Sequence, residues 1–296
     1  MAYRLRILSS SEALGFAHMT FPIYRSAIGN GALAVGAYSG DIPAGLALVM
    51  PSADRKKAEL LSLYVDGPQR LRGMGSMLLN HVETALRRAG IAFIHTSWSE
   101  NLSGAPAFQS VLAKCDWSEP QKRMLVMRGD MSGAFGDGMR KKGPRYESRD
   151  CLPRQYELSL WGDMTKADRA FILSKEGKPH WYARRANPFR EERIVVPTNS
   201  LILRKDGEIV GWLVVHRTAP DTLRFTDVFI REDLKRVGAV SIAMVSHGFW
   251  LQMIEGTPKL TMALERNNKP LVRMCETRLG DMGGLSWTWG AKKEYG

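Results

Sequence analysis

Hydrophobic runs and turn residues divide the first 130 residues into short segments of regular structure. Strands are expected where apolar runs end at glycine, proline or polar clusters: 3–7, 32–37, 43–50, 60–65, 91–98 and 123–128. Helices are expected over 10–24, 74–90 and 105–114. The Ser39-Gly40-Asp41 turn between the second and third strands predicts a hairpin.

The stretch from Leu60 to Gly90 has the clearest pattern, a strand, a turn and an amphipathic helix. The apolar residues of the helix recur at the spacing of one helical face: Met74, Leu78, Val82, Ala85 and Leu86. Ser76 is placed to cap the start of this helix, and Gly90 is placed to end it.

The turn before this helix has the residues of an anion site. Gly73 and Gly75 lack a Cβ, so backbone N–H groups there can approach a ligand closely. The first-turn N–H groups have no helical partner and carry the positive end of the helix dipole. Arg70 and Arg72 add positive charge. A pyrophosphate suits such a site, whereas a helix start with incidental glycines is the alternative.

The ordered string Arg70-Leu71-Arg72-Gly73-Met74-Gly75, followed by Ser76, resembles the R/Q-x-x-G-x-G/A pattern of the GNAT family of acyl-CoA-dependent N-acyltransferases. The resemblance implies that the turn binds the pyrophosphate of coenzyme A and that acetyl-CoA, or another acyl-CoA, is the co-substrate. It implies that the strand residues Leu63, Tyr64 and Val65 align the pantetheine arm and hold the oxyanion through a backbone N–H. Asn101, after the 91–98 strand, is a further candidate contact to that arm; a turn-forming asparagine is the alternative.

The second half of the chain repeats the plan of the first. Asp206-Gly207 predicts a second hairpin, and Gly211 follows it as Gly45 follows the first. The segment from Asn268 matches the one from Ala105, at nearly the same offset. We therefore expect an α/β (α+β, mixed-sheet) protein of two tandem GNAT folds: a domain at 1–130, a linker at 131–155 and a degenerate copy at 156–296.

The second copy lacks the phosphate turn. At that place it has Lys235-Arg236-Val237-Gly238-Ala239-Val240, with one glycine and a β-branched residue at the second key position. Its expected role is to complete the acceptor site or to support the first domain.

A base is needed because an amine acceptor arrives protonated. Glu59, at the start of the strand that leads to the turn, matches the position of the glutamate base in the histone-acetyltransferase branch of the family. A solvent-facing glutamate is the alternative, and Asp66 and Glu100 are the next candidates. The tyrosine that protonates the departing sulfur in many relatives is replaced by Leu112 and, in the second copy, by Cys275. Tyr64 is the candidate acid within the first domain.

His180-Trp181-Tyr182-Ala183-Arg184-Arg185 mixes rings and cations. We expect a helix with its rings inward; an acceptor pocket or a surface that stacks on bases is the alternative. Trp287 and Trp289 alternate as in a late strand.

Composition narrows the setting. The 296 residues carry a net charge of +12, which favours anionic partners such as coenzyme A or an acidic carrier protein. A solvated basic surface is the simpler explanation, so nucleic acid is not expected. The three cysteines show no zinc spacing, which suggests a reducing cytoplasm and no metal. Neither a signal peptide nor a membrane span is expected.

The leading hypothesis is an N-acyltransferase acting through the first domain on a small-molecule or peptide amine. The alternatives are an enzyme that takes a longer acyl chain or an acyl carrier protein as donor, a catalytically silent module that senses acyl-CoA, and an acyltransferase that binds RNA. The acceptor and the oligomeric state do not follow from the sequence.

Overall fold

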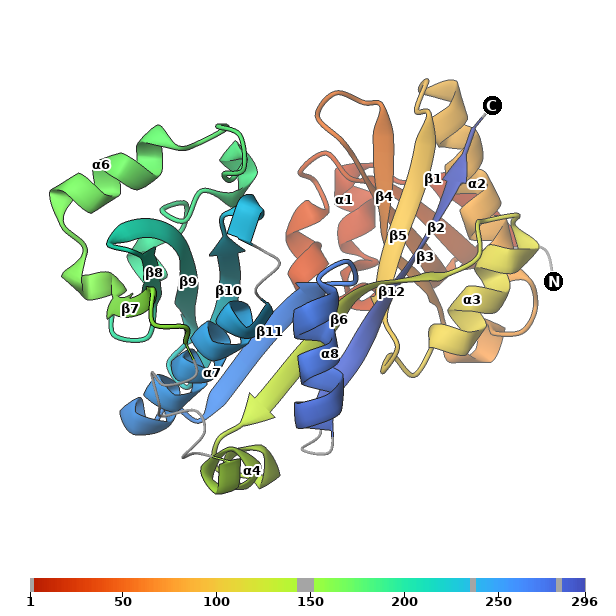
Figure 1. The fold of residues 1–296 in the computed structure, drawn as a ribbon. Helices are drawn as coiled ribbons and strands as arrows, with labels where there is room; N and C mark the ends of the chain where they lie inside the picture. The colour runs from red at the N-terminus through yellow and green to blue at the C-terminus, as the bar shows by residue number, and fades with distance from the viewer. Residues whose placement is uncertain (1–2, 143–151, 235–237, 281–283, 296) are drawn as a thin grey trace. The chain divides into compact units, whose positions relative to one another are not determined.

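A computed structural model describes residues 3–142, 152–234, 238–280 and 284–295. The chain folds into two compact units. Unit 1 comprises Met1–Arg123 together with Trp287–Gly296, and unit 2 comprises Met124–Ser286. The C-terminal segment, blue in Figure 1, thus belongs to the same unit as the N-terminal strands.

Unit 1 begins with β1 (Tyr3–Ile7), α1 (Ser10–Leu14), β2 (Leu33–Ser39) and β3 (Ile42–Pro51). The expected hairpin is confirmed, but the helix expected over 10–24 is wrong beyond Leu14. Gly15 ends α1, and the chain continues as 3₁₀ segments, Ala17–Met19 and Pro22–Ala27. Ser9 caps α1 in a capping box with Glu12.

The rest of unit 1 contains β4 (Lys57–Val65), α2 (Met74–Arg88), β5 (Phe93–Ser99), α3 (Ala105–Lys114) and the larger part of β12 (Leu285–Glu294). The apolar face expected for α2 is buried at Met74, Leu78, Val82 and Leu86. Gly90 follows α2 with φ +75°, the left-handed conformation that glycine adopts after a helix.

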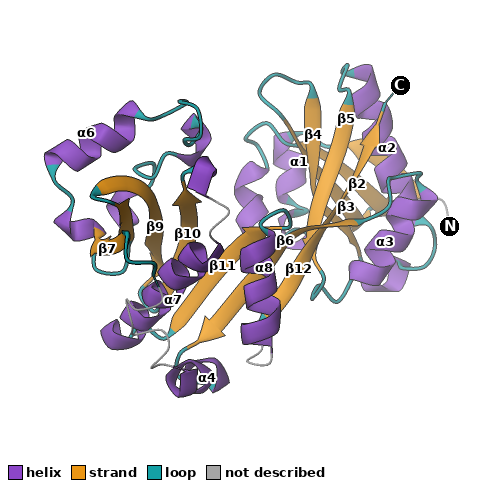
Figure 2. Ribbon diagram, viewed as in Figure 1, coloured by secondary structure: helices purple, strands orange, loops and turns teal. Residues whose placement is uncertain are grey.

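The strands of unit 1 are ordered β1-β2-β3-β4-β5-β12. Neighbours are antiparallel except β4 and β5, which are parallel. One core lies between the sheet and α2 and α3, and a second core lies on the opposite face, under α1 (Figure 2). Trp287 and Trp289 lie in β12, so the late strand is confirmed.

Unit 2 has the same plan. It contains most of β6 (Gln121–Asp130), α4 (Ala134–Lys142), β7 (Tyr156–Leu160), α6 (Lys166–Ser174), β8 (Leu201–Lys205), β9 (Glu208–Ala219), β10 (Thr222–Ile230), α7 (Gly238–Glu255), β11 (Lys259–Glu265) and α8 (Lys269–Met274). Its strands are ordered β6-β11-β10-β9-β8-β7, and β10 and β11 are its parallel pair.

An irregularity at the same place in both units confirms the repeat. Between β3 and β4 the register skips Leu61, because Leu48 pairs with Ser62 and Val49 pairs with Leu60. Between β9 and β10 it skips Thr226 in the same way. The two bulges are 226 − 61 = 165 residues apart. β-Bulges change the direction of a strand and are common next to functional sites, so we interpret this bulge as a shared structural feature of the two units.

The division into units differs from the expected boundaries at 130 and 156. The apolar run at 123–128 forms a strand, as expected, but β6 pairs with β11 of unit 2. The place next to β5 is taken by β12 from the far end of the chain. Each repeat therefore gives its last strand to the other repeat's sheet.

Two other expectations need correction. The stretch expected as a linker, 131–155, contains helix α4, and its residues 143–151 lie outside the described part of the chain. The helix expected over 180–185 is absent: His180 has φ +67°, and only a 3₁₀ turn, Arg184–Ala186, follows. The two rings do face inward, because Trp181 and Tyr182 pack against Phe229.

Candidate active site

Strands β4 and β5 separate soon after they meet. Their pairing covers Lys57, Ala58 and Glu59 on β4, which face Phe93, Ile94 and His95. One further link joins them, a hydrogen bond of 3.0 Å from Thr96 Oγ1 to the Leu60 carbonyl. No strand in the described part of the chain pairs with the β5 side of residues 61–65. An extended ligand can therefore add to this edge of β4 as an extra strand would.

The bulge at Leu61 lies where the separation begins. A bulge bends and twists its strand, so it turns the remainder of β4 away from its parallel neighbour. Beyond it, Leu63 and Val65 pack toward α2, and Tyr64 packs toward the α1 side. The predicted pantetheine residues thus lie along the open edge.

The turn at the end of β4 leads directly into α2. After a 3₁₀ turn at Gly67–Gln69, two residues take left-handed conformations, Leu71 with φ +62° and Gly73 with φ +82°. Gly73 is the N-cap of α2, and no side chain caps this end. Among the described residues no acceptor is found for the amides of Met74, Gly75 and Ser76. The helix therefore presents free N–H groups and its positive dipole end at the open strand edge.

The two glycines of the turn serve different purposes. A Cβ on Gly73 would meet nothing within 4 Å, so the left-handed backbone is what calls for glycine there. A Cβ on Gly75 would lie 3.1 Å from Val111 Cγ2, so glycine at this position lets α3 pack closely on α2. Ser76 is inside the helix, so its expected capping role is wrong: the cap position belongs to Gly73.

Of the side chains in this turn, Arg70 is bonded to the end of β4, and Leu71 and Arg72 are exposed. Arg70 donates from Nε to the Val65 carbonyl at 2.9 Å, and its guanidinium lies 5.8 Å from the centre of the Tyr64 ring. Arg72 is exposed, and no ion pair to it occurs in the described residues. The Leu71 side chain is fully exposed in a strained conformation, as is common where a loop contacts a ligand.

Glu59 lies where the strands part, with two neighbours that the sequence did not reveal. His95 is its partner on β5, and Tyr24 lies close enough for Glu59 to raise the tyrosine pKa, after the larger effect of burial. Burial lowers the pKa of His95, and the charges of Lys57 and Arg123 lower it further while Glu59 opposes them. The alternation of the 91–98 segment placed His95 on a strand, but only the sheet order shows that it faces Glu59.

Glu100, Asp66 and Asn101, the other candidate residues, form hydrogen bonds that hold strands and turns in place. The Glu100 carboxylate accepts the Trp287 N–H at 2.6 Å and the Trp289 indole N–H at 3.4 Å, so it fastens β12. The Asp66 N–H donates to the Ala44 carbonyl at the end of β4. Asn101 is exposed in a turn, and its N–H donates to Ser99 Oγ at 3.3 Å.

The two positions at which the family resemblance led us to look for a tyrosine acid offer no replacement for it. Leu112 is buried in the unit 1 core and has no proton to give. Cys275 is fully buried, and burial raises the pKa of its thiol to about 12. A proton donor for the leaving sulfur would have to come from elsewhere.

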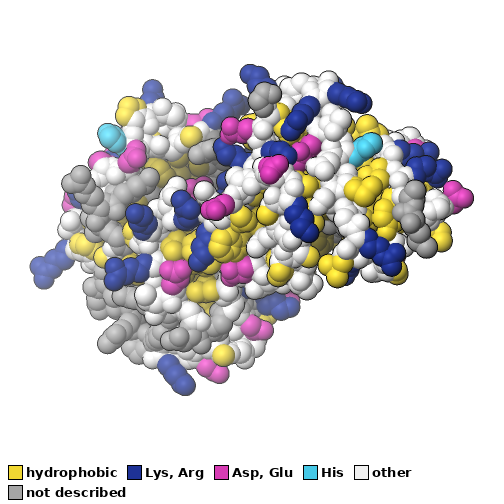
Figure 3. Space-filling view, turned by 90° about the vertical axis from the view of Figure 1, so that its right-hand side faces the viewer, with side chains coloured by type: hydrophobic (Ala, Val, Ile, Leu, Met, Phe, Trp, Pro, Cys, Tyr) yellow, Lys and Arg dark blue, Asp and Glu magenta, His cyan; other side chains and the backbone are white. Residues whose placement is uncertain are grey.

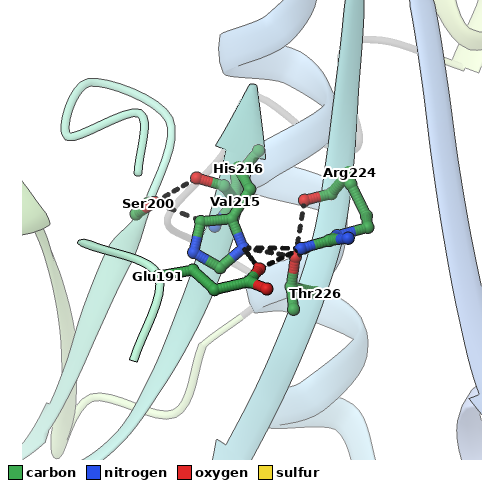
Figure 4. A network of polar contacts seen from close by, with 6 residues as sticks. All are labelled: Glu191, Ser200, Val215, His216, Arg224 and Thr226. Atoms are coloured by element: carbon green, nitrogen blue, oxygen red, sulfur yellow. Dashed lines mark hydrogen bonds and ion pairs between the residues drawn. The ribbon is translucent and has the colours of Figure 1, made fainter. Parts of the chain in front are cut away.

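In unit 2 the place of Glu59 is taken by Arg224, at the same offset of 224 − 59 = 165 as the bulge. Arg224 forms an ion pair with Glu191 beside His216 (Figure 4). His216 Nδ1 lies 2.7 Å from Thr226 Oγ1 and 3.6 Å from Glu191 Oε2, and its Nε2 is buried without a partner in the described residues. Charged and polar groups bonded to one another thus occupy the position that Glu59 has in unit 1. In unit 2 the counterpart of the turn before α2 begins at residues 235–237, which lie outside the described residues.

The molecular surface shows no single region of positive charge on the face in Figure 3, where Lys and Arg side chains are interspersed with Asp and Glu. In the described ranges, no helix combines the length and the apolar character that a membrane crossing requires.

Comparisons with known proteins identify the fold. Residues 5–109 match the sequence model of the acetyltransferase (GNAT) family. No curated protein sequence matches the chain. A tandem GNAT protein from the clavulanic acid biosynthesis pathway is similar in structure, with 14% identity and a TM-score of 0.57, over 100% of this chain and 99% of that one. A GCN5-related N-acetyltransferase from Sphaerobacter thermophilus has 14% identity and a TM-score of 0.61, over 99% and 95% of the two chains. The glucosamine N-acetyltransferase region of a fungal multi-domain β-N-acetylglucosaminidase has 13% identity and a TM-score of 0.62, over 98% of this chain and 38% of that one.

Proposed function

We propose that this chain, a tandem GNAT fold with a GNAT domain at residues 5–109, transfers an acyl group from acyl-coenzyme A to an amine through unit 1. One observation carries the proposal: the open edge of β4 ends at the uncapped start of α2. An acyl-pantetheine arm extended along residues 63–65 would have its pyrophosphate at the free amides of residues 74–76 and its thioester toward Glu59. Acetyl-CoA is the simplest donor for this arrangement.

The residues of unit 1 then divide the reaction between them. Glu59, directly or through a water molecule, takes a proton from the ammonium, because only the neutral amine attacks the thioester carbonyl. A backbone N–H on the open edge of β4 stabilises the oxyanion as the C–N bond forms. The C–S bond then breaks and coenzyme A departs as a thiolate, while the nitrogen, still carrying one proton more than an amide, releases that proton to the thiolate or to water. The pKa of the coenzyme A thiol, roughly the 8.5 of a free thiol, allows it to leave without full protonation, so the leucine at position 112 does not stop turnover.

Unit 2 has a supporting role in this proposal. The replacement of the glutamate position by Arg224, and its ion pair with Glu191, leave that unit without a base at the corresponding place. It contains β11, the strand that pairs with β6 from the end of the first repeat. Acyl transfer therefore depends on unit 1 alone.

The second candidate is a silent module that binds acyl-CoA without turnover, and the buried Leu112 favours it. Incubation with acetyl-CoA and a panel of primary amines separates the two. Release of free thiol that depends on both the amine and Glu59 supports acyl transfer. Acetyl-CoA binding without amine-dependent thiol release supports the silent module, and failure to bind acetyl-CoA rejects both.

A further inference from the structure

The face of the unit 1 sheet that carries Glu59 and His95 also carries positive charge. Lys57 precedes Glu59 by two residues on β4, so both side chains leave the same face, roughly 7 Å apart at their Cα atoms. The intervening Ala58 is buried in the core on the opposite face, which fixes this orientation. Lys57 is exposed, and it forms no ion pair with any described residue.

Arg123 reaches the same face by crossing β12. Gly290 pairs with Ser97 on β5, two residues beyond His95. A Cβ on Gly290 would lie 3.0 Å from Arg123 Cγ and 3.2 Å from Arg123 Cδ. Because Gly290 has no side chain, the methylene groups of Arg123 can lie directly over its backbone. Because Ser97 and His95 leave the same face of β5, the stem lies on their side of the sheet.

The cations of this face differ in whether they form an ion pair. Lys292, the β12 partner of His95, is paired with Glu294 at 2.6 Å. Lys57 and Arg123 have no such partner in the described residues, and both charges act on His95. Glu59 is then the one carboxylate of the group available to meet an ammonium, with two cations beside it.

We propose that the acceptor is an amine that also carries an anionic group, a carboxylate or a phosphate, which Arg123 and Lys57 bind while Glu59 receives the ammonium. A zwitterion matches the alternation of charge along this face: cation at 57, anion at 59, cation at 123. Arg123 and Lys57 determine specificity and do not touch the reacting bond. The inference rests on the proposed function, because it names the acceptor class of the same site.

The test measures binding to the CoA-saturated full-length protein by calorimetry and turnover by thiol release. The probes are matched amines: amino acids with their primary amides and their decarboxylated amines, and phosphoethanolamine with ethanolamine. The variants are Arg123→Met, which keeps the stem over Gly290, and Lys57→Gln. Lys56→Gln is the matched control, because this exposed lysine lies in the bend before β4 and outside the strand that carries Lys57 and Glu59.

We expect at least one anionic amine to bind about tenfold or more tightly than its neutral partner. Each of the two variants should remove most of that preference by raising KM with little change in kcat, and Lys56→Gln should keep it. The amino-acid and phosphoethanolamine pairs distinguish a carboxylate from a phosphate. Equal binding of neutral and anionic partners, or no binding by any anionic amine, overturns the inference. A separate titration with acetyl-CoA tests the proposed function: absence of binding in the wild type rejects that function and not only the acceptor class. Arg123→Met and Lys57→Gln should bind acetyl-CoA normally, because both residues lie away from the pyrophosphate turn.

Discussion

The ammonium of Lys293 on β12 lies 2.7 Å from the carboxylate of Glu83 on α2, and the Glu83 side chain is 5% exposed and that of Lys293 14%. Trp117 Nε1 donates to the same carboxylate at 2.8 Å, and the lysine also donates to the Cys115 carbonyl. A residue near the end of the chain thus satisfies a charge in the core beside the helix of the candidate site. The exchange of strands between repeats is therefore fastened by a buried ion pair.

Removing one partner of that pair should destabilise the protein strongly. Lys293→Met leaves Glu83 buried without its counter-charge, and such a change costs about 3–5 kcal/mol. Lys292→Met is the control, because its exposed pair with Glu294 contributes about 0–1 kcal/mol. Urea unfolding of both variants measures the difference. Equal stability of the two variants would show that the Glu83 charge needs no partner.

The first repeat should not fold without the last strand of the second. A fragment of residues 1–130 leaves β5 with an unpaired edge and Glu83 without Lys293. We expect this fragment to be unfolded or aggregated. Residues 1–123 joined by a flexible Gly/Ser linker to 285–296 should recover a cooperative thermal transition. A cooperative transition in the shorter fragment would contradict the strand exchange.

Glu59→Gln should lower kcat by about 10²- to 10⁴-fold, the usual contribution of a general base. The affinity for acetyl-CoA should not change, because Glu59 lies at the opposite end of the open strand edge from the helix start. A thiol-release assay measures kcat and calorimetry measures the affinity for acetyl-CoA. The exposed Glu119→Gln is the control. Full activity in Glu59→Gln would move the search for the base to His95.

Stability should fall as the pH is lowered, in part through His216. Burial, and then the Arg224 charge, lower the pKa of His216 in the folded protein, although Glu191 opposes them. The unfolded chain therefore binds this proton more readily than the folded one. The stabilisation is complete above the ordinary histidine pKa, about 6.5, and is lost as the pH falls below it.

Thermal unfolding between pH 8 and pH 5 tests this sign. His216→Asn should make Tm less dependent on pH, whereas the exposed His18→Asn should leave the dependence unchanged. A Tm that rises on acidification in the wild type, and does so only with His216 present, would mean that Glu191 dominates and that the histidine is charged when folded.

Local patterns in the sequence predicted the elements of the site but not their neighbours. The strand at 60–65, the turn and the helix from Met74 follow from apolar spacing and glycine positions, because these features are set by residues close together in the chain. The pairing of Glu59 with His95 depends on which strands are adjacent, which no local pattern records. The same limit explains the misplaced domain boundary. The strand at 123–128 pairs antiparallel with β11 of the second repeat. In the first repeat the equivalent edge is that of β5, which β12 occupies, and the sequence of the strand does not distinguish the two edges.

Calorimetric titration with acetyl-CoA tests the central claim, that the uncapped start of α2 holds a pyrophosphate. Three proteins are compared: the wild type, Gly73→Asp and Gly90→Asp. Both glycines have left-handed backbones with open space around them, so the two variants share strain and charge, at opposite ends of one helix. The account predicts one site per chain, a Kd at least tenfold higher in Gly73→Asp and a nearly unchanged Kd in Gly90→Asp. No binding by the wild type, or equal binding by Gly73→Asp, would contradict it.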